Sequence, residues 1–442
     1  MKHFLSPFGA PFAAIALAAL SPAPAAARLA APEQKMVQVV DKEQARTLAL
    51  LETMVNQNSG TLNNPGVEAV GRMARAEFEA LGFEVRWVPM AEANRSGHLI
   101  AVHKGNGRGK RMLLIGHLDT VFEPDSPFQK FAMKSPTTAV GPGVGDDKGG
   151  VAVMIAALRA MHQAGTLKNA DIEVVLTGDE EDAGKPISVS RRDLIEAGRR
   201  ADVALDFEGL STENGLDMGS IARRGSGDWE LRTTGRTGHS SRIFSDHLGN
   251  GAIYELARII AAFRQELPEP NLTFNVGLVL GGATATLDEA GIRGQATGKN
   301  NIIPEVAIAR GDIRTLSLDQ YQRVAAKMKE IVARHMPGTG ATISFDEAAY
   351  PPMAPTPGGQ ALLDRLNRVN ADMGLAKMEA QDPLKRGAGD IGFVAADVDG
   401  LVGLGPAGAG SHAAGETIDV PSLWRQAKRA AILMTRLSRE KR

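Results

Sequence analysis

The sequence contains no cysteine among its 442 residues. Disulfide bonds and thiolate metal sites are therefore excluded, and any metal site must use histidine and carboxylate ligands, which suit Zn, Mn or Co. Neither sign of charge is in excess, since 50 Lys and Arg stand against 51 Asp and Glu. Aromatic residues make up only 5% of the chain. They form no stripe with basic residues, so nucleic acid is not expected as a partner.

Long apolar runs are also missing, and none could cross a bilayer. A short apolar run, 11–20, follows Lys2 and His3 and precedes Ala25–Ala27. A charged start, a short apolar region and an Ala-x-Ala exit are typical of a secretory signal peptide, cleaved here after the last alanine. The alternative is a frayed, alanine-rich terminus. We expect a signal peptide over 1–27 and a periplasmic or secreted protein with no membrane segment after its removal.

The chain is longer than one ordinary hydrophobic core requires, so two domains are expected. Helical spacing marks 41–57, 66–82 and 151–163, and strands are expected at 83–88, 98–103, 110–116, 172–177 and 201–209. Strands and helices alternate, and acidic residues follow several of the strands. This pattern predicts an α/β domain, with a mixed, mainly parallel sheet, helices on both faces and a site at its C-terminal edge.

From about Ala222 the pattern becomes strand, helix, strand, strand, helix, strand, which is the order of a ferredoxin-like unit. The strands are expected at 228–234, 272–280, 306–315 and 342–346, and the helices at 248–265 and 318–335. We place this α+β unit at 222–347. It is inserted between two parts of the α/β domain, 33–221 and 348–442.

Acidic residues crowd the end of the strand 172–177, where the run Gly178–Asp182 places Glu180 beside Glu181. Two adjacent glutamates at the end of a buried strand are costly without a counter-charge. A bound cation would remove this cost, and one carboxylate could then ligate while its neighbour handles protons. The alternative is a solvated acidic turn.

The strand 110–116 runs into His117 and Asp119. With a period of two, both side chains point to the same side of an extended segment. A carboxylate in this position can orient an imidazole and raise its basicity as a metal ligand. A structural hydrogen-bonded pair is the alternative.

The glycine-rich stretch Gly141–Gly150 precedes the helix 151–163. It lacks the Gly-Lys-Ser/Thr ending of a phosphate-binding loop, and Asp146 and Asp147 stand where an anion would lie. An acidic turn at a helix N-terminus suits a cation instead. Capping of the helix by Asp146 or Asp147 alone is the alternative.

Six motifs follow one another along the chain: His117–Asp119, Gly141–Gly150, Asp179–Glu181, Asp206–Glu208, Asn301–Pro304 and Gly405–His412. In this order they resemble the M20 family of co-catalytic zinc metallopeptidases, and in particular its glutamate carboxypeptidase branch. The resemblance extends from about residue 45 to the end of the chain. It implies a catalytic domain that carries an inserted lid and dimerisation domain.

The resemblance also implies two Zn²⁺ ions per subunit, which Co²⁺ or Mn²⁺ can replace. His117 and Glu208 would hold one ion, and Glu181 and His412 would hold the other. Asp146 would bridge the pair. This set supplies three protein ligands to each ion and leaves a position for a shared water.

Glu180 would act as the general base that takes a proton from the bridging water, which the ions acidify while they polarise the scissile carbonyl. Asp119 would orient His117. Asp206 is a rival to Glu208 for the fourth carboxylate, since strand alternation puts both on one face. We favour Glu208, because it lies nearer the end of the strand and matches the family position.

In the inserted unit, Gly235–Ser241 resembles the family's lid motif, which implies that His239 reaches the active site of the partner subunit and stabilises an oxyanion. A surface histidine on a turn is the alternative. This motif implies a homodimer formed through the lid domain. Four further positions resemble substrate contacts: Asn275, Arg314, Asn301 and Gly389. Arginine suits bidentate recognition of a carboxylate, although a lone arginine is often merely solvated.

The sequence departs from the family pattern at two places. Ala388–Asp390 reads Ala-Gly-Asp where Gly-Thr-Asp is usual, and His239 is followed by Ser-Ser in place of Ala-Gly. Both departures bear on the substrate's side chain and not on the metal centre.

We therefore expect a secreted dizinc carboxypeptidase that cleaves an amide bond and releases a C-terminal amino acid, with glutamate as a candidate, from a small peptide or N-acyl amino acid. An aminoacylase-like deacylase or a dipeptidase with the same metal core is the alternative. A non-catalytic, metal-dependent binding protein is the alternative of another class. Glu180 argues against it, because a site that only binds metal does not need a second adjacent glutamate.

Overall fold

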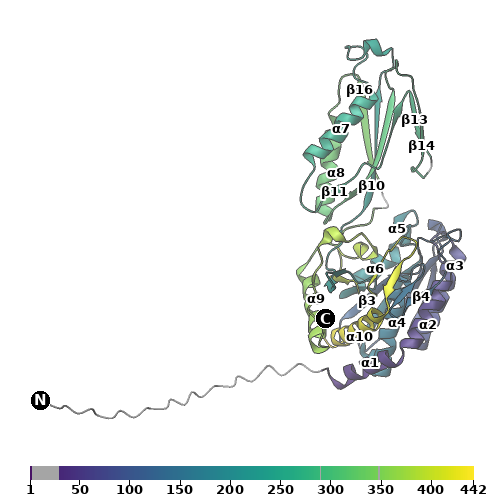
Figure 1. Cartoon of the computed structure of the whole chain (residues 1–442), viewed down its shortest axis with the longest axis vertical. Helices are drawn as coiled ribbons and strands as arrows, with labels where there is room; N and C mark the ends of the chain where they lie inside the picture. Colours follow the sequence, from purple (N-terminus) through teal and green to yellow (C-terminus); the bar gives the residue numbers. More distant parts are fainter. Residues whose placement is uncertain (2–28, 289, 347–348) are drawn as a thin grey trace.

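The computed structural model describes residue 1 and residues 29–288, 290–346 and 349–442. Apart from Met1, the predicted signal peptide, 1–27, lies outside the described residues. Two units follow one another along the molecule's long axis, one built from both ends of the chain and one inserted between them (Figure 1). The residue limits given above for the domains stay a prediction. No helix in the described stretches has the length and apolarity needed to span a bilayer.

The main unit is built on a six-stranded sheet with the strand order β1-β2-β6-β3-β7-β18. These strands are β1 (Glu84–Pro89), β2 (Gly97–His103), β3 (Arg111–His117), β6 (Asp171–Thr177), β7 (Val203–Asp206) and β18 (Gly400–Val402). β3 runs parallel to β6 and β7, and β18 runs parallel to β7. The pairings of β1 with β2 and of β2 with β6 are antiparallel. The predicted mixed, mainly parallel sheet is confirmed.

Helices cover both faces of this sheet, as the alternation of side chains along β3 illustrates. Leu114 packs into the core that also contains α4 (Lys148–Gln163) and α10 (Val420–Leu437). Leu113 packs on the opposite face, in a core shared with α6 (Arg192–Arg200). Successive side chains of a strand point to opposite faces, so a strand that is apolar throughout is buried on both sides. The remaining helices of this unit are α1 (Ala31–Lys42), α2 (Gln44–Asn56), α3 (Asn64–Ala80), α5 (Ile187–Ser190) and α9 (Pro357–Asp372).

A small four-stranded sheet, ordered β19-β20-β5-β4, lies beside the large one in the main unit. Its strands are β4 (Ala132–Ser135), β5 (Thr138–Val140), β19 (Gly408–Ala409) and β20 (Thr417–Asp419). Thr417 of β20 pairs with Val140 of β5. The loop that follows β5 and the loop that precedes β20 therefore start side by side. A further three-stranded sheet contains β8 (Thr212–Glu213), β9 (Leu216–Gly219) and β17 (Glu379–Ala380).

The inserted unit has an antiparallel sheet in which β12, β15, β10 and β16 are neighbours in that order. Its elements are β10 (Gly227–Gly235), α7 (Ala252–Glu266), β11 (Thr273–Phe274), β12 (Leu278–Gly282), β15 (Val306–Arg314), α8 (Leu318–Ala333) and β16 (Thr339–Phe345). This strand order, with two helices, is that of the predicted ferredoxin-like unit. The hairpin of β13 (Thr284–Leu287) and β14 (Gly294–Thr297) is an addition that the sequence pattern did not reveal.

The strand predicted over 272–280 is wrong as a single strand, because a bulge divides it into β11 and β12. Phe274 pairs with Ile313, but Leu278 pairs with Arg310, so one residue too many lies between the two pairs. An extra residue of this kind is a β-bulge. Asn275, which we expected on a strand, lies in the bulge. Gly311 makes room for it, since an added Cβ there would collide with the Asn275 carbonyl oxygen.

Two connecting segments join the units and pair with each other. Isolated bridges link Arg223 with Met353 and Ser226 with Tyr350. Each segment therefore has a fixed partner where it leaves the main unit. Side chains from both segments reach the predicted site, as described next.

Candidate metal centre

Parallel strands bring the predicted site residues to one edge of the large sheet. His117 is the last residue of β3, Glu180 and Glu181 follow β6, and Glu208 follows β7. The carboxyl ends of parallel strands meet at the same edge, which is where α/β proteins place their sites. Asp146 arrives there from the loop that precedes α4. His412 arrives from the loop between β19 and β20.

A chain of close contacts connects four of the five predicted ligands. Asp146 stands between two imidazoles, with Oδ1 3.0 Å from His117 Nε2 and Oδ2 3.3 Å from His412 Nε2. His412 Nε2 also lies 2.9 Å from Glu181 Oε2. Ligand atoms of His117, Asp146 and Glu181 all fall within 4.8 Å of one another. An aspartate with one oxygen toward each of two histidines has the geometry of a bridging ligand.

Glu208 faces the same site, but an arginine holds it. Its Oε1 lies 2.6 Å from Arg223 Nη1, and it lines a cavity of about 150 Å³ together with Asp146 and Arg386. Asp206 is fully buried, and its Oδ1 accepts a hydrogen bond of 2.9 Å from the Glu208 N–H. Of these two rivals, Glu208 is therefore the carboxylate on the cavity, while Asp206 supports its backbone from beneath.

Asp119 connects the histidine to the glutamate turn. It is completely buried, and its Oδ1 lies 3.3 Å from His117 Nδ1. The same carboxylate accepts hydrogen bonds from the N–H groups of Glu180, at 3.0 Å, and Glu181, at 3.1 Å, and from the Thr61 hydroxyl, at 2.7 Å. One side chain thus fixes the ring orientation of His117 and the turn that presents both glutamates.

Asp147 does not cap α4, because its side chain makes no capping hydrogen bond. Its Oδ2 accepts a hydrogen bond of 3.2 Å from the N–H of His117 instead, and its other oxygen is buried without a hydrogen-bond partner among the described residues. The capping interpretation of this aspartate is therefore wrong. The unpartnered oxygen lies against the start of α4, since a Cβ added at Gly150 would be 2.1 Å from it, and burial raises the pKa of Asp147 well above its ordinary value.

The electrostatics of the cluster favour a cation as well. Burial raises the pKa of Glu180 well above its ordinary value and raises the pKa of Glu181 to about 7. Burial alone would lower the pKa of His117, but its contacts with Asp119 and Asp146 raise it. The cluster therefore takes up protons to offset its excess of negative charge. Metal ions bind such a set by displacing those protons.

Removal of metal by a chelator should leave a protein whose thermal stability falls as the pH rises from about 5 to 8. Burial raises the pKa of both Glu181 and Asp206 to about 7 in the folded state. Between the unfolded pKa, near 4 for carboxyls, and about 7, the folded state binds more protons than the unfolded state, so stability declines with pH. His412 acts in the same direction, because Asp146 and Glu181 raise its pKa to about 11, and the stability it contributes is lost as the pH rises toward that value.

This trend can be measured by calorimetry with a chelator at pH 5.5 and pH 8, and then with Zn²⁺ restored. Added Zn²⁺ should raise the melting temperature more at pH 8 than at pH 5.5, since it replaces protons that are already lost at the higher pH. A metal-free protein that melts at a higher temperature at pH 8 would contradict the electrostatic account of the cluster.

Three residues that sequence reasoning did not find support the site. Arg191 is fully buried, with Nη1 2.6 Å from Asp179 Oδ1 and Nε 2.7 Å from Asp390 Oδ1. Tyr350 accepts a hydrogen bond of 2.9 Å from Arg191 and donates one to the carbonyl oxygen of Glu180. Arg223, from the other connecting segment, holds Glu208. No signal in a single sequence identifies these partners, because they come together only in the fold.

The predicted lid residues lie in the inserted unit and bond within it. His239 Nδ1 lies 2.8 Å from the Ser241 hydroxyl, and Arg314 Nε lies 3.0 Å from Asp312 Oδ2. The Asn301 carbonyl accepts a hydrogen bond of 2.9 Å from the Ser240 N–H. The structure therefore does not bring these side chains, or Asn275 in its bulge, into contact with the ligand cluster of the same chain.

Gly389, by contrast, lies directly against the cluster. A Cβ added at this position would lie 2.5 Å from Glu208 Oε1 and would also collide with the Arg223 guanidinium. A side chain at this position would therefore require the ends of Arg223 and Glu208 to move.

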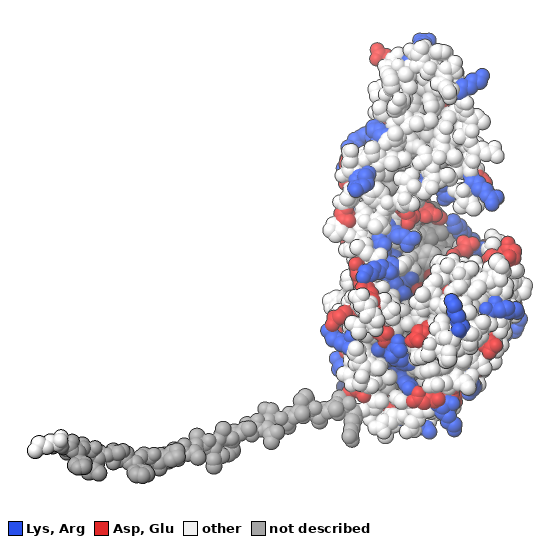
Figure 2. Space-filling model, viewed as in Figure 1, with Lys and Arg blue, Asp and Glu red and all other residues white. Residues whose placement is uncertain are grey.

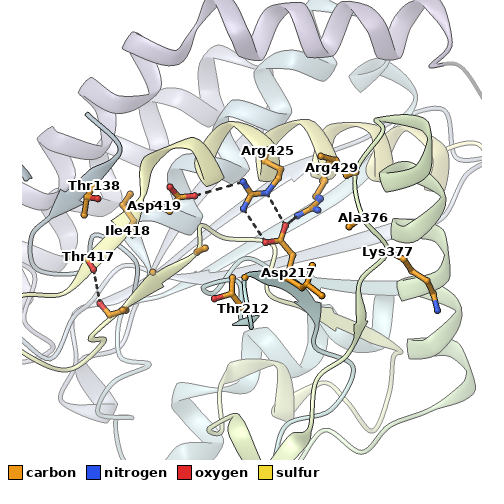
Figure 3. Close-up of a pocket in the computed structure, with 16 residues that line it drawn as sticks. Thr138, Thr212, Asp217, Ala376, Lys377, Thr417, Ile418, Asp419, Arg425 and Arg429 are labelled. Atoms are coloured by element: carbon orange, nitrogen blue, oxygen red, sulfur yellow. Dashed lines mark hydrogen bonds and ion pairs between the residues drawn. The ribbon is translucent and has the colours of Figure 1, made fainter. Parts of the chain in front are cut away.

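A larger cavity lies elsewhere, beside α10, with a volume of about 620 Å³ (Figure 3). Asp217 is its central carboxylate, but Oδ2 lies 3.0 Å from Arg425 Nε and 2.5 Å from Arg429 Nη1. Its charge is thus neutralised within the protein, and none of the predicted metal ligands lines this cavity. The smaller cavity, by contrast, is lined by two of the predicted ligands, Asp146 and Glu208. Figure 2 shows charged side chains of both signs around the hollow between the two units.

An imidazole and carboxylate cluster at the carboxyl edge of a mainly parallel sheet, combined with a ferredoxin-like insertion, defines a two-domain metallohydrolase. The chain belongs to peptidase family M20/M25/M40, which matches residues 113–436. It is thus a member of a family of metal-dependent peptidases, as the motifs had indicated.

The proteins that this chain resembles carry names of different activities. Carboxypeptidase G2 of Pseudomonas sp. (strain RS-16) is 29% identical over 301 residues, which cover 67% of this chain and 66% of that enzyme. A succinyl-diaminopimelate desuccinylase of Leptothrix cholodnii is 25% identical over 392 residues, 85% of this chain and 95% of the relative. The Bacillus subtilis YXEP protein, a dinuclear metal-binding peptidase from the M20 family, shares the fold with a TM-score of 0.62 and 17% identity, covering 90% of this chain and 99% of that one.

Proposed function

We propose that this protein is a dizinc carboxypeptidase that hydrolyses an amide bond and releases a C-terminal amino acid, with glutamate as the first candidate. The observation that carries the proposal is the pair Glu180 and Glu181, whose backbone N–H groups share the buried carboxylate of Asp119. Glu181 Oε2 lies 2.9 Å from His412 Nε2. Glu180 is close enough to His117 for its charge to help raise the pKa of that imidazole. We infer that the two adjacent glutamates have different roles, Glu181 as a metal ligand and Glu180 as the base.

The residues present fit two ions. His117 and Glu208 would hold one, Glu181 and His412 the other, and Asp146 would lie between them, as its 3.0 and 3.3 Å contacts with the two imidazoles suggest. The raised pKa values of the buried Glu180 and Glu181 carboxyls support a cationic occupant. When bound, zinc would supply Lewis acidity toward a water and the scissile carbonyl.

Glu180 would move the protons. Its carboxylate would take a proton from the attacking water and pass it to the nitrogen of the leaving amino acid, so that no net proton is consumed. Burial raises its pKa well above the ordinary value, which makes the carboxylate a stronger base. The Asp119 contact with its N–H would hold it in place.

We propose further that two copies associate through the inserted unit, so that His239 serves the site of the partner copy. Apolar side chains are exposed on this unit, among them Phe244 at 63%, Tyr254 at 51% and Val279 at 53%. Phe244 and Tyr254 contact each other edge to face, with ring centroids 5.5 Å apart. Exposed apolar side chains that gather in this way are typical of an interface.

Mixing Glu180→Gln subunits with His239→Ala subunits should restore activity that neither variant has alone, and no restoration would refute the shared site.

Arg314, Asn275, Asn301 and Gly389 are proposed as substrate contacts, with Arg314 for a carboxylate. The second candidate function is deacylation of an N-acyl amino acid or cleavage of a dipeptide at the same centre. The similarity of this chain to a succinyl-diaminopimelate desuccinylase over 85% of its length supports this second candidate.

A substrate screen separates the two candidates. We expect purified, zinc-loaded protein to release glutamate from peptides and aroyl conjugates with a C-terminal glutamate at a higher kcat/KM than it deacylates N-succinyl or N-acetyl amino acids. The reverse order would favour the deacylase. Turnover of neither class, with two ions bound, would support a binding protein instead.

We also propose that the protein is exported and processed after Ala27, on the strength of the charged start, apolar run and Ala-x-Ala exit at its N-terminus. N-terminal sequencing of protein recovered from outside the cytoplasm tests this. A mature protein that keeps its first residues would refute the proposal.

A further inference from the structure

Glu416 is a buried carboxylate outside the predicted ligand set, and it binds the turn that carries Asp146. Only 1% of its surface is exposed. Its Oε1 accepts hydrogen bonds from the N–H groups of Gly145, at 2.7 Å, and Asp146, at 2.9 Å. Its Oε2 accepts a third from the Gly143 N–H, at 2.9 Å. The backbone carbonyl of Glu416 accepts a fourth from the Gly141 N–H, at 3.2 Å.

These contacts satisfy groups that have no other regular partner. The turn 141–147 lies between β5 and α4, so its N–H groups take part in neither a strand ladder nor the helix. Buried N–H groups left without an acceptor are costly. A carboxylate forms stronger hydrogen bonds to them than a neutral acceptor would. Glu416 alone therefore supplies the acceptors that the backbone would otherwise have to provide for the N–H groups of this turn.

The same glutamate belongs to the loop that carries His412. That loop, 410–416, leads directly into β20, and β20 pairs with β5, from which the Asp146 turn begins. His412 has a φ of 65°, which is uncommon for a residue other than glycine, so its side chain is aimed by a particular loop conformation. Glu416 fixes the end of that loop to the Asp146 turn.

We propose that Glu416 is a positioning residue for the metal centre, which holds Asp146 between His117 and His412 without touching either ion. This inference rests on the proposed function, because it assumes that Asp146 bridges two ions. It extends that function by assigning a role to a residue outside the ligand set. Metal affinity should then depend on a carboxylate that lies one step behind the ligands.

Two substitutions at this position test the proposal. Glu416→Gln keeps the shape but replaces one oxygen by an NH2 group, which would face a backbone N–H, so one donor of the turn loses its acceptor. Glu416→Asp keeps the charge but shortens the side chain by one methylene. Both variants should loosen the Asp146 turn while they leave all five ligands in the chain.

A matched control is Glu255→Gln in the inserted unit. Glu255 is also fully buried, and its Oε2 accepts a hydrogen bond of 2.9 Å from the Met336 N–H. It has no part in the proposed site. Loss of its charge should lower the melting temperature of the protein without a change in metal binding.

The experiment titrates chelator-treated full-length protein with Co²⁺, followed by its visible absorption, and measures kcat and KM at saturating Zn²⁺. We expect Glu416→Gln and Glu416→Asp to bind Co²⁺ about 10- to 100-fold more weakly than the unaltered protein, as is usual when a group behind a ligand is lost. We expect a fall in kcat with little change in KM. Glu255→Gln should keep the original affinity.

Co²⁺ binding by both variants with the original affinity would overturn the role of Glu416. If one variant fails to fold, as circular dichroism would show, the other decides. Failure of the proposed function is distinguishable, because in that case the unaltered protein itself would bind no Co²⁺ pair or hydrolyse no amide.

Discussion

Glu180→Gln should lower kcat by about 1,000-fold while the protein keeps both metal ions, since general acid–base catalysis commonly contributes 100- to 10,000-fold. Glutamine has nearly the same shape, and the Glu180 N–H would still donate to Asp119, at 3.0 Å. An amide cannot accept a proton from water under these conditions. The loss should therefore appear in kcat, and KM should change little.

Two neighbours in the same turn provide controls. Glu181→Gln removes a carboxylate that contacts His412 at 2.9 Å, and it should lower metal content as well as activity. Asp182→Asn changes an exposed carboxylate, 61% accessible, that pairs with Arg95, and it should leave both unaffected. Metal content by elemental analysis and steady-state kinetics on the best substrate of the screen distinguish the three.

Full activity of Glu180→Gln would refute the general base. Loss of metal together with activity would show that Glu180 is a ligand, and it would exchange the roles of the two glutamates. Retained metal with lost hydrolysis also argues against the binding-protein alternative, because a site that only binds would not respond to this change.

Much of the fold followed from periodicity in the sequence. The apolar runs at 110–116 and 172–177 are buried on both faces of the sheet as β3 and β6, and the acidic residues behind them meet at one edge. Such runs are strong signals, because a parallel strand must be apolar throughout. The convergence of His117 and Glu181 therefore follows from two local patterns and one topological rule.

Elements that depend on distant partners escaped prediction. The strand at 272–280 looks continuous, but its pairing with β15 contains an extra residue, and register is a property of two strands together. α1 was not expected, because its stability comes from packing on α4 and α10 more than from its own sequence.

In the site, too, local motifs could be predicted from the sequence and distant partners could not. The ligands stand in recognisable motifs, whereas the side chains that hold them do not. Arg191 meets Asp390 across 199 positions of the chain, and Glu416 meets Asp146 across 270. A lone buried arginine or glutamate has no local signature, so only the fold reveals its partners.

Asp146→Asn should have the largest effect on metal binding. The two oxygens of this carboxylate each face one imidazole, at 3.0 Å from His117 and 3.3 Å from His412. Burial would raise its pKa, but the hydrogen bonds with both histidines outweigh burial and hold the pKa well below its ordinary value, so it stays ionised. An amide offers one oxygen only, and its NH2 group would face the second imidazole and its ion.

We expect Asp146→Asn to weaken binding of both ions by more than about 100-fold, since loss of a group behind a ligand alone costs 10- to 100-fold. Activity should be undetectable at ordinary zinc concentrations. Asp217→Asn is the control, because Asp217 is a largely buried aspartate paired with Arg425 and Arg429 beside the larger cavity. Asp217→Asn should lower the thermal stability of the protein and leave its metal content unchanged.

Elemental analysis after dialysis, combined with Co²⁺ titration, measures both variants. If Asp146→Asn loses only one ion and keeps the other with its original affinity, Asp146 is a ligand to a single metal. The geometry of an aspartate placed between two histidines predicts otherwise, because a residue that bridges two ions cannot be changed without weakening both. The simultaneous loss of the pair is thus the result that distinguishes a shared centre from two neighbouring sites.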